Sequence, residues 1–507
     1  MRTQPTAQTV RTGAVGSAEQ PQPTDGRRWL ALGVIAIAQL MVVLDASIVN
    51  IAMPSAQIDL GISDANRQWM VTAYMLAFGG LLMLGGRISD FAGRKRMFLI
   101  GLFGFAAASV LGGAATGEAM LYASRALQGV FAAVLAPAAL SLLTVTFTDA
   151  KERARAFGVY GAVTGGGAAI GLISGGVLTE YLNWRWCMYV NVPIALVAAF
   201  AGVRLLDESR ADGRTRYDVP GAVLSSTGLV ALVYGFTQAE QNGWSSPRTW
   251  LFLAAGAVLL AAFFTVQARS DHPMLPLRVL TDRNRAGAFL TSLLTGLALF
   301  GFFLFMTYYF QVVLGYSALQ SGFAYLPFSA GMTLAAYVAS SLLPRYGPRP
   351  LMLTGFLLAI GAMVWLARLT PTSSYAAHAL PAMAVLAFGI GLSFVPLAST
   401  ALIGVENRDA GIASALVNST YQIGGSLGTA LLNTLAASAT AGYLAAHPAT
   451  GPTATARQVR DQGLVHGYSV AYLWSAAFLL AAAAGTALLI KASPKELDSM
   501  EQAVAMH

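Results

Sequence analysis

The chain alternates long apolar runs with short polar connections. An apolar run of about 20 residues is long enough to cross the hydrocarbon core of a bilayer as a helix. A helix is the expected conformation there, because it pairs its own backbone donors and acceptors where water is absent. Fourteen such runs are centred near residues 40, 76, 107, 132, 168, 198, 228, 259, 299, 331, 359, 390, 423 and 480. The pattern therefore predicts an all-α polytopic membrane protein.

Composition agrees with this prediction. Hydrophobic residues make up 56% of the chain, charged residues make up 11%, and the mean hydropathy is +0.60. A soluble domain carries about 25% charged residues. The two ends differ from the rest: residues 1–28 are rich in Thr, Gln and Pro, and residues 492–507 lack an apolar run. We expect cytoplasmic tails at both ends, the first of them disordered rather than a cleaved signal peptide.

The Lys and Arg residues predict which side of the membrane each connection faces, because cytoplasmic connections retain positive charge. If the N-terminus lies inside, most of the 31 Lys and Arg residues fall in inner segments. The outer segments hold Arg67, Arg185, Arg248, Arg368, Arg457 and Arg460. We therefore expect a multi-pass protein of the cell membrane with both termini in the cytoplasm. The net charge of +8 then reflects topology rather than nucleic-acid binding.

Several classes of function lack their usual residues in this sequence. The single cysteine, Cys187, cannot form an internal disulfide, and no Cys and His cluster has the spacing of metal ligands. No loop of the Walker type, repeated filter loop or nucleophile–base arrangement is present. The five histidines fall in predicted loops or in the tail: His272, His378, His447, His466 and His507. The sequence predicts neither an enzyme, a channel nor an ATP-driven pump, and it predicts no cofactor.

Two cytoplasmic connections resemble each other and indicate an internal repeat. GGRISDFAGRKRMFLIG (85–101) follows the second span, and SSLLPRYGPRPLMLTG (340–355) follows the tenth. Aligning Gly93 with Gly347 also pairs Lys95 with Arg349. Membrane transport proteins often consist of two such related halves. We expect six-helix bundles at 29–207 and 284–491, separated by a linker at 208–283 that carries two additional central transmembrane helices.

At this point the motifs resemble those of the major facilitator superfamily, and specifically its fourteen-span drug:proton antiporter branch. The loop signature of the superfamily is matched by Gly86, Asp90, Gly93, Arg94 and Lys95. The fourth-helix signature of proton-driven members is matched by Arg125, Gln128 and Gly129. Three further stretches are typical of the branch: LDASIVNIAMP (44–54), WRWCMYVNVP (184–193) and YFQVVLGYSALQSGFAYLP (309–327).

The resemblance implies a secondary active transporter with the major facilitator fold, in which two pseudo-symmetric bundles alternate access to the two sides. It implies export of small hydrophobic or cationic drugs or antibiotics, driven by the proton gradient, by a protein that works as a monomer in the lipid bilayer. Two alternatives remain open at this point. The first is a dedicated exporter of one endogenous metabolite, lipid or antibiotic, and the second is a uniporter or importer of the same fold.

The fifth span departs from the pattern of the branch. Antiporters of this family usually carry a Gly-Pro pair there, whereas this chain has Leu172 after Gly171. Because proline removes a backbone donor and favours a kink, Leu172 predicts a straighter helix. Gly167, Gly171 and Gly175 recur every four residues, so they line one helix face and allow close helix packing.

Asp45 and Arg125 are the predicted proton-coupling pair. Asp45 lies in an apolar stretch without another charge between Arg28 and Asp59. It is roughly 24 Å of helix from Trp29, and Arg125 is about 7 Å below the outer start of its own span. The two residues therefore fall in the same half of the membrane, where a charge needs a partner or a function. The alternative is that Asp45 reaches water at the helix end and that Arg125 extends to the interface.

The other candidate residues are assigned by the resemblance. Gly86, Asp90, Gly93 and Arg94 form a conformational latch, in which Asp90 holds the two halves together in the outward-facing state. The alternative is a tight turn whose basic residues only fix topology. Aromatic and amide side chains near the midplane would line a substrate pocket, although each could equally pack helices: Tyr74, Phe78, Gln128, Phe302, Met306, Tyr325, Asn418, Tyr421 and Gln422.

Overall fold

The computed structural model describes residues 25–210, 217–270, 272–405, 410–448 and 453–492. Most of both predicted tails, residues 1–24 and 493–507, therefore lies outside the described residues. Every regular element of the described chain is a helix. The first group of helices comprises α1 (Asp25–Asp59), α2 (Trp69–Ala92), α3 (Arg94–Gly113), α4 (Glu118–Thr146), α5 (Ala150–Tyr181), α6 (Trp186–Tyr189) and α7 (Asn191–Leu205).

Two long helices follow this group, and a second group completes the chain. The inserted pair is α8 (Val219–Asn242) and α9 (Pro247–Arg269). The second group begins with α10 (Arg278–Thr281), α11 (Arg283–Tyr308), the π-helical turn η1 (Tyr309–Val313), α12 (Ala318–Ala324) and α13 (Leu326–Tyr346). It continues with α14 (Pro348–Leu366), the π-helical turn η2 (Tyr375–Ala379), α15 (Leu380–Leu402), α16 (Ala410–Ala446) and α17 (Thr453–Leu489).

The helices agree with the predicted spans except at one of the fourteen positions. Thirteen helices of the described chain are long and apolar enough to cross a membrane. The span predicted near residue 423 is the exception, because Ser, Thr, Asn and Gly interrupt the apolar residues of the 37-residue helix α16. Five of its polar side chains are buried against protein: Ser419, Ser426, Thr429, Asn433 and Thr434.

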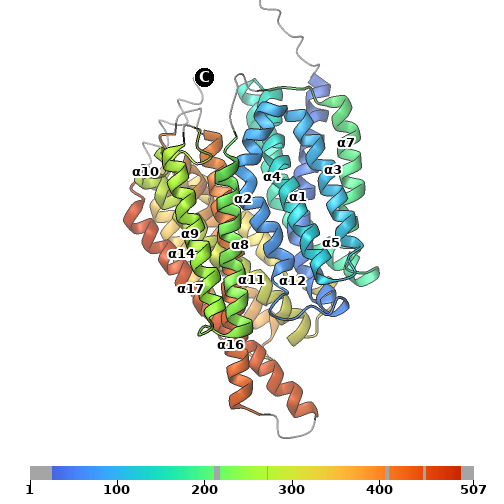
Figure 1. Cartoon of the computed structure of the whole chain (residues 1–507), viewed down its shortest axis with the longest axis vertical. Coiled ribbons are helices and arrows are strands. Elements are labelled where there is room, and N and C mark those ends of the chain that lie inside the picture. Colours follow the sequence, from blue (N-terminus) through green and yellow to red (C-terminus); the bar gives the residue numbers. More distant parts are fainter. Residues whose placement is uncertain (1–24, 211–216, 271, 406–409, 449–452, 493–507) are drawn as a thin grey trace, which may run out of the picture.

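The helices form two bundles with the inserted pair across their junction (Figure 1). Helix α8 packs on α9, on α2 of the first bundle and on α16 of the second. Helices α16 and α17 continue as a hairpin beyond one end of the molecule (Figure 1). We call the end at which α1 begins the inner end, following the orientation predicted from charge, and the opposite end the outer end.

The internal repeat is visible in the backbone. Gly93 joins α2 to α3 with φ +114°, and Gly347 joins α13 to α14 with φ +75°. Residues with side chains rarely adopt this region, so both turns require glycine. Helix α3 packs on α4 as α14 packs on α15. The α2–α4 and α13–α15 units are thus equivalent parts of the two halves, as the alignment of the two connections predicts.

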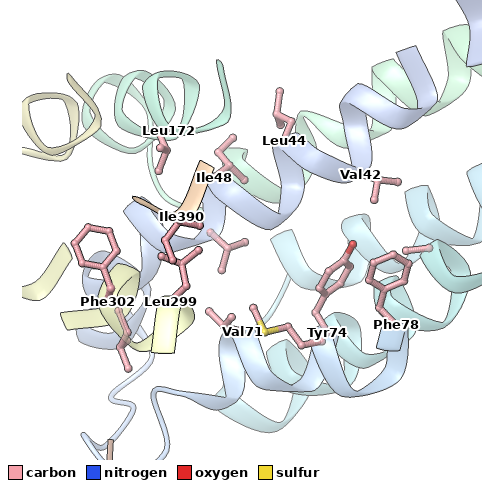
Figure 2. Packing of buried hydrophobic residues seen from close by; sticks show 14 of the residues in the cluster. Val42, Leu44, Ile48, Val71, Tyr74, Phe78, Leu172, Leu299, Phe302 and Ile390 are labelled. Carbon is pink, nitrogen blue, oxygen red and sulfur yellow. The ribbon is translucent and has the colours of Figure 1, made fainter. Parts of the chain in front are cut away.

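The hydrophobic core extends through both bundles. One cluster of buried side chains includes residues from α1, α2 and α5 as well as from α11 and α15. Figure 2 shows part of it, with Leu44 and Ile48 of α1, Tyr74 of α2 and Phe302 of α11. The core therefore fixes α1 between neighbours from several elements, and it is α1 that carries Asp45.

The two bundles are joined by hydrogen bonds at the outer end. Gln311 donates to the carbonyl oxygen of Ile51 at 3.0 Å, and the amide of Leu319 donates to Glu180 at 2.9 Å. Gly176 of α5 lies directly against the backbone of α12. Toward the middle of α5 the bundles diverge and leave an apolar groove of about 700 Å³. The molecule is therefore closed at its outer end.

Candidate functional site

Asp45 and Arg125 form an ion pair in the interior of the first bundle. The Arg125 Nη1 donates to Asp45 Oδ2 at 2.6 Å. Asp45 is completely buried, and Arg125 is 1% exposed. Neither side chain reaches water at a helix end, which removes the alternative interpretation of each. Burying two charges is costly unless they are paired and otherwise hydrogen-bonded, so the surrounding donors and acceptors decide whether the pair is tolerated.

Groups from three helices, α2, α4 and α7, surround the pair. Gln128 and Asn191 both donate to Asp45 Oδ1, at 3.0 and 2.7 Å. The Arg125 Nε donates to the carbonyl oxygen of Met70 at 2.9 Å, and its Nη1 also donates to Gln128 Oε1 at 2.6 Å. The guanidinium lies 4.7 Å from the ring centre of Tyr74. Both charges therefore have hydrogen-bond partners within the protein, which a buried ion pair requires.

Close helix packing positions these groups. Arg125 and Gln128 are three residues apart on α4, so both face the same way. Gly129 allows α4 to approach α2, since a Cβ at this position would lie 2.4 Å from the carbonyl oxygen of Tyr74. Gly171 similarly brings α5 against α1, where a Cβ would lie 2.8 Å from Ser47 Cβ. Helix α5, which carries Leu172 where the branch usually has proline, is continuous from Ala150 to Tyr181.

Asn191 and Ser109 belong to the site and are absent from the sequence-based candidates. Ser109 of α3 accepts from Gln128 at 2.8 Å and from Asn191 at 3.4 Å. Both Ser109 and Asn191 are fully buried. Asn191 lies within WRWCMYVNVP, a stretch that the sequence interpretation used only as a family signature. A polar amide at the start of the apolar helix α7 could have indicated that it takes part in a buried polar site.

The predicted latch residues lie at the inner end, at the turn between α2 and α3. Asp90 Oδ1 accepts from Arg94 Nε at 3.0 Å and from the Ser141 hydroxyl at 3.3 Å. The carboxylate of Glu208 accepts from the backbone amides of Lys95 and Arg96, at 3.1 Å each. An acid at a helix N-terminus is favourable because the helix dipole is positive there.

Of the two latch glycines, Gly93 is the one that must provide room at this turn. A Cβ on Gly93 would lie 2.8 Å from Glu208, so glycine is needed both for the backbone conformation and for the approach of the acid. A Cβ on Gly86 would lie 3.5 Å from the ring of Pro137, which is an ordinary contact distance, so the space there does not require glycine. The contacts found for Asp90 and Arg94 all lie within the first bundle and the segment that follows it, and Glu208 was missed by the sequence interpretation.

The predicted pocket residues fall into three groups rather than around one cavity. Tyr74, Phe78 and Gln128 are buried near the ion pair, with the Tyr74 and Phe78 rings 5.7 Å apart (Figure 2). Phe302, Met306 and Tyr325 are fully buried in the second bundle, where Phe302 stacks on Phe328 at 5.3 Å. The third group lies on α16 and is partly or fully exposed: Asn418, Tyr421 and Gln422.

The groove between the bundles has a different lining. Its volume is about 700 Å³, and it lies between α5 and α13. Its walls are small or apolar: Gly165, Gly166, Ala169, Leu326, Ser329, Ala330, Thr333, Leu334 and Tyr337. None of the predicted pocket residues is among them. The GGG run at 165–167 could have indicated this groove in the sequence. Gly167 faces Val43 of α1, whereas its two neighbours face the groove.

Comparison with known proteins identifies the family. The model of the Major Facilitator Superfamily matches residues 35–429. The puromycin resistance protein pur8 of Streptomyces alboniger is 50% identical over 481 residues, which cover 94% of this chain and 94% of that protein. The cephamycin export protein CmcT of Amycolatopsis lactamdurans is 41% identical over 418 residues, which cover 81% of this chain and 86% of that protein.

Solved structures share the fold at much lower identity. A bacterial homologue of the human lysosomal transporter Spinster, solved in an inward-facing and unoccupied conformation, gives a TM-score of 0.62 at 17% identity. The match covers 92% of this chain and 98% of that chain. The family predicted from the motifs is thereby confirmed, and the chain belongs to the Major Facilitator Superfamily as a membrane transporter rather than an enzyme.

Proposed function

We propose that this transporter exports small hydrophobic or cationic antibiotics in exchange for protons, by alternating access of its two bundles. The relatives that cover most of the chain are named for puromycin resistance and cephamycin export. Their similarity extends along the whole transport fold instead of being confined to one segment. We place the protein in the cell membrane as a monomer with cytoplasmic termini, following the distribution of Lys and Arg.

The buried pair of Asp45 and Arg125 carries the proposal of proton coupling. Among the described residues, Asp45 and Asp218 are the buried carboxylates, and Asp218 lies at a helix end. An acid inside a membrane domain is expensive to keep and marks a functional position. Its contact with Arg125 at 2.6 Å gives the ionised carboxylate a partner that a proton can replace.

The proton step follows from these contacts. A proton that binds Asp45 removes the negative charge and ends the ion pair. Arg125 then keeps its contacts with Met70, Gln128 and Tyr74, so its charge is not left without partners. Release of the proton on the inner side restores the pair. Because Asp45 is completely buried in this conformation, both exchanges need a change of state that opens a path to water.

The groove between α5 and α13 is the proposed route for substrates. Its lining is mostly apolar, which suits ligands that partition into lipid. The outer ends of α5 and α12 are in direct contact, so the groove is open away from the outer end. A hydrophobic compound could therefore enter from the inner half of the membrane in this state and leave after the outer end opens.

The latch around Asp90 and Arg94 is proposed to act in the opposite state. Here the contacts of Asp90 remain within the first bundle, as expected for a latch that is released while the outer end is closed. When the inner end closes, Asp90 would come within reach of the second bundle. A contact that forms in one state only favours that state.

Transport in vesicles tests the proposal. The protein is reconstituted with a pH-sensitive dye inside, a pH gradient is imposed, and puromycin-like and cephamycin-like compounds are added. The native protein should move protons when a substrate is added, and Asp45→Asn should lose this flux while still binding substrate. Full pH-gradient-driven transport by Asp45→Asn would overturn the assignment. Substrate movement without proton flux in the native protein would favour a uniporter.

A further inference from the structure

A second charged cluster lies at the outer end, around Arg67 in the connection between α1 and α2. Arg67 is only 5% exposed although it stands outside a helix. Its Nε donates to Asn433 Oδ1 at 3.2 Å, and its guanidinium lies 4.1 Å from the ring centre of Tyr308. Asn433 belongs to α16 and Tyr308 to α11. A cation of the first bundle is thus buried by the second bundle.

The inserted pair of helices supplies an acid to this cluster. Asn433 Nδ2 donates to Glu240 Oε2 of α8 at 3.1 Å and to the backbone carbonyl of Asp64 at 3.1 Å. Close by, the Thr434 hydroxyl donates to the carbonyl oxygen of Phe236 of α8 at 2.9 Å. Asn433 is therefore the point at which the first bundle, the second bundle and the inserted pair meet.

The cluster contains more acid than base. Arg67 donates to Asp64 Oδ1 at 3.3 Å, and Asn433 links it to a second carboxylate, that of Glu240. The Asp64 side chain is 68% exposed and therefore well solvated, whereas Glu240 is only partly exposed. Further charges face the cluster across its neighbours: Glu118 through Asn66, and Arg460 and Asp461 of α17 through Tyr468. Because the carboxylates near Arg67 outnumber the buried cation, one of them can bind a proton without leaving Arg67 unpaired.

We propose that Glu240 is a second proton-binding site and that its protonation loosens the outer closure of the transporter. In the ionised state Glu240 accepts from Asn433 and helps to balance the charge of Arg67. A proton taken up from water at the outer end forms an O–H bond on the Glu240 carboxyl, and no other covalent bond changes. The balance against Arg67 is then lost, and the neutral carboxyl accepts from Asn433 more weakly than the carboxylate does.

This inference rests on alternating access as proposed above, but it does not require Asp45 to carry the transported proton. It assigns a function to the inserted pair: Glu240 of α8 responds to the pH at the outer end and changes the contact between the two bundles. Low pH at the outer end should favour the outward-open state, in which substrate leaves. Hydrogen bonds to charged groups contribute more to stability than neutral hydrogen bonds do. Loss of the charge on Glu240 therefore shifts the equilibrium between the outer-closed and outward-open states when these are close in free energy.

Distance measurements on the full chain test the inference. Spin labels are placed at Ile58→Cys on the outer end of α1 and at Ala377→Cys on η2, both of which are exposed. Cys187 is buried and can stay. Pulsed electron resonance in lipid nanodiscs should show a short distance at high pH and a growing longer population as pH falls. Glu240→Gln should show the longer population at every pH, and Glu240→Asp should retain the pH response.

Three further outcomes separate the possibilities. Glu240→Gln with the pH profile of the native protein would overturn the inference. So would loss of the response in Asp64→Asn with a normal response in Glu240→Gln, because Asp64 would then be the proton acceptor. The response should persist in Asp45→Asn; if it vanishes there while Glu240→Gln behaves as native, Asp45 alone senses pH and only the assignment of Glu240 fails.

Discussion

Replacing Arg125 by methionine tests whether the buried ion pair is held as a unit. The substitution keeps an apolar stem of similar length but leaves Asp45 charged and completely buried. Removing one partner of a buried pair costs about 3–5 kcal/mol, because the other charge stays behind without compensation. Gln128 and Asn191 still donate to Asp45 Oδ1 at 3.0 and 2.7 Å, which places the expected loss toward the lower end of this range.

A second substitution should return part of that loss. Asp45→Asn in the Arg125→Met background removes the isolated charge while its side-chain oxygen still accepts from Asn191, so we expect a recovery of about 1–3 kcal/mol. Lower pH should also lessen the defect of Arg125→Met, because a proton can neutralise the carboxylate. Thermal unfolding in detergent, followed by the fluorescence of the eight tryptophans, ranks the variants by stability.

The pair of Asp90 and Arg94 provides a matched control. Its N–O distance is 3.0 Å, but the two side chains are 38% and 16% exposed. An exposed pair contributes about 0–1 kcal/mol, so Arg94→Met should change unfolding little. The reasoning fails if Arg125→Met is as stable as the native protein, or if adding Asp45→Asn brings no recovery. Either result would mean that the buried charges are not energetically coupled.

Two further predictions concern packing and the inserted pair. Gly171→Ala should destabilise the protein by about 1–3 kcal/mol, because a Cβ there would lie 2.8 Å from Ser47 Cβ. Gly158→Ala on the same helix meets nothing within 4 Å and should instead raise the unfolding midpoint. Asp218→Ala should cost about 1–2 kcal/mol through loss of the cap of α8, and Asp218→Asn should restore part of it. Burial alone would raise the pKa of Asp218, but hydrogen bonds from Gln267, Gly221 and Met274 outweigh it and lower that pKa. Its contribution should therefore be present above the ordinary carboxyl pKa and be lost as pH falls through the lowered value; a midpoint difference between native and Asp218→Ala that stays constant over that fall would contradict this.

Local pattern was sufficient for the elements and the family of this protein. Apolar runs of membrane-crossing length predict helices without knowledge of their neighbours, since lipid leaves the backbone few alternatives. Repeated motifs around Gly93 and Gly347 indicate two halves, because a sharp turn between two helices favours a positive φ and therefore glycine in each half. The helix α16 shows the limit of this reasoning: its polar residues lower its hydropathy, and only packing against α2, α11 and α17 explains why it is buried.

Contacts between distant segments were decided by the tertiary structure. The sequence by itself determined that Asp45 is isolated in an apolar helix and that Arg125 stands in the same half of the membrane. The sequence could not show that Asn191, which lies 146 residues after Asp45, donates to that carboxylate. An amide in an apolar stretch does not indicate which residue it will contact. The cluster of Arg67, Asn433 and Glu240 joins three separate parts of the chain in the same way. Hydropathy is a property of neighbours along the chain, whereas the partner of a buried charge is set by how the helices pack.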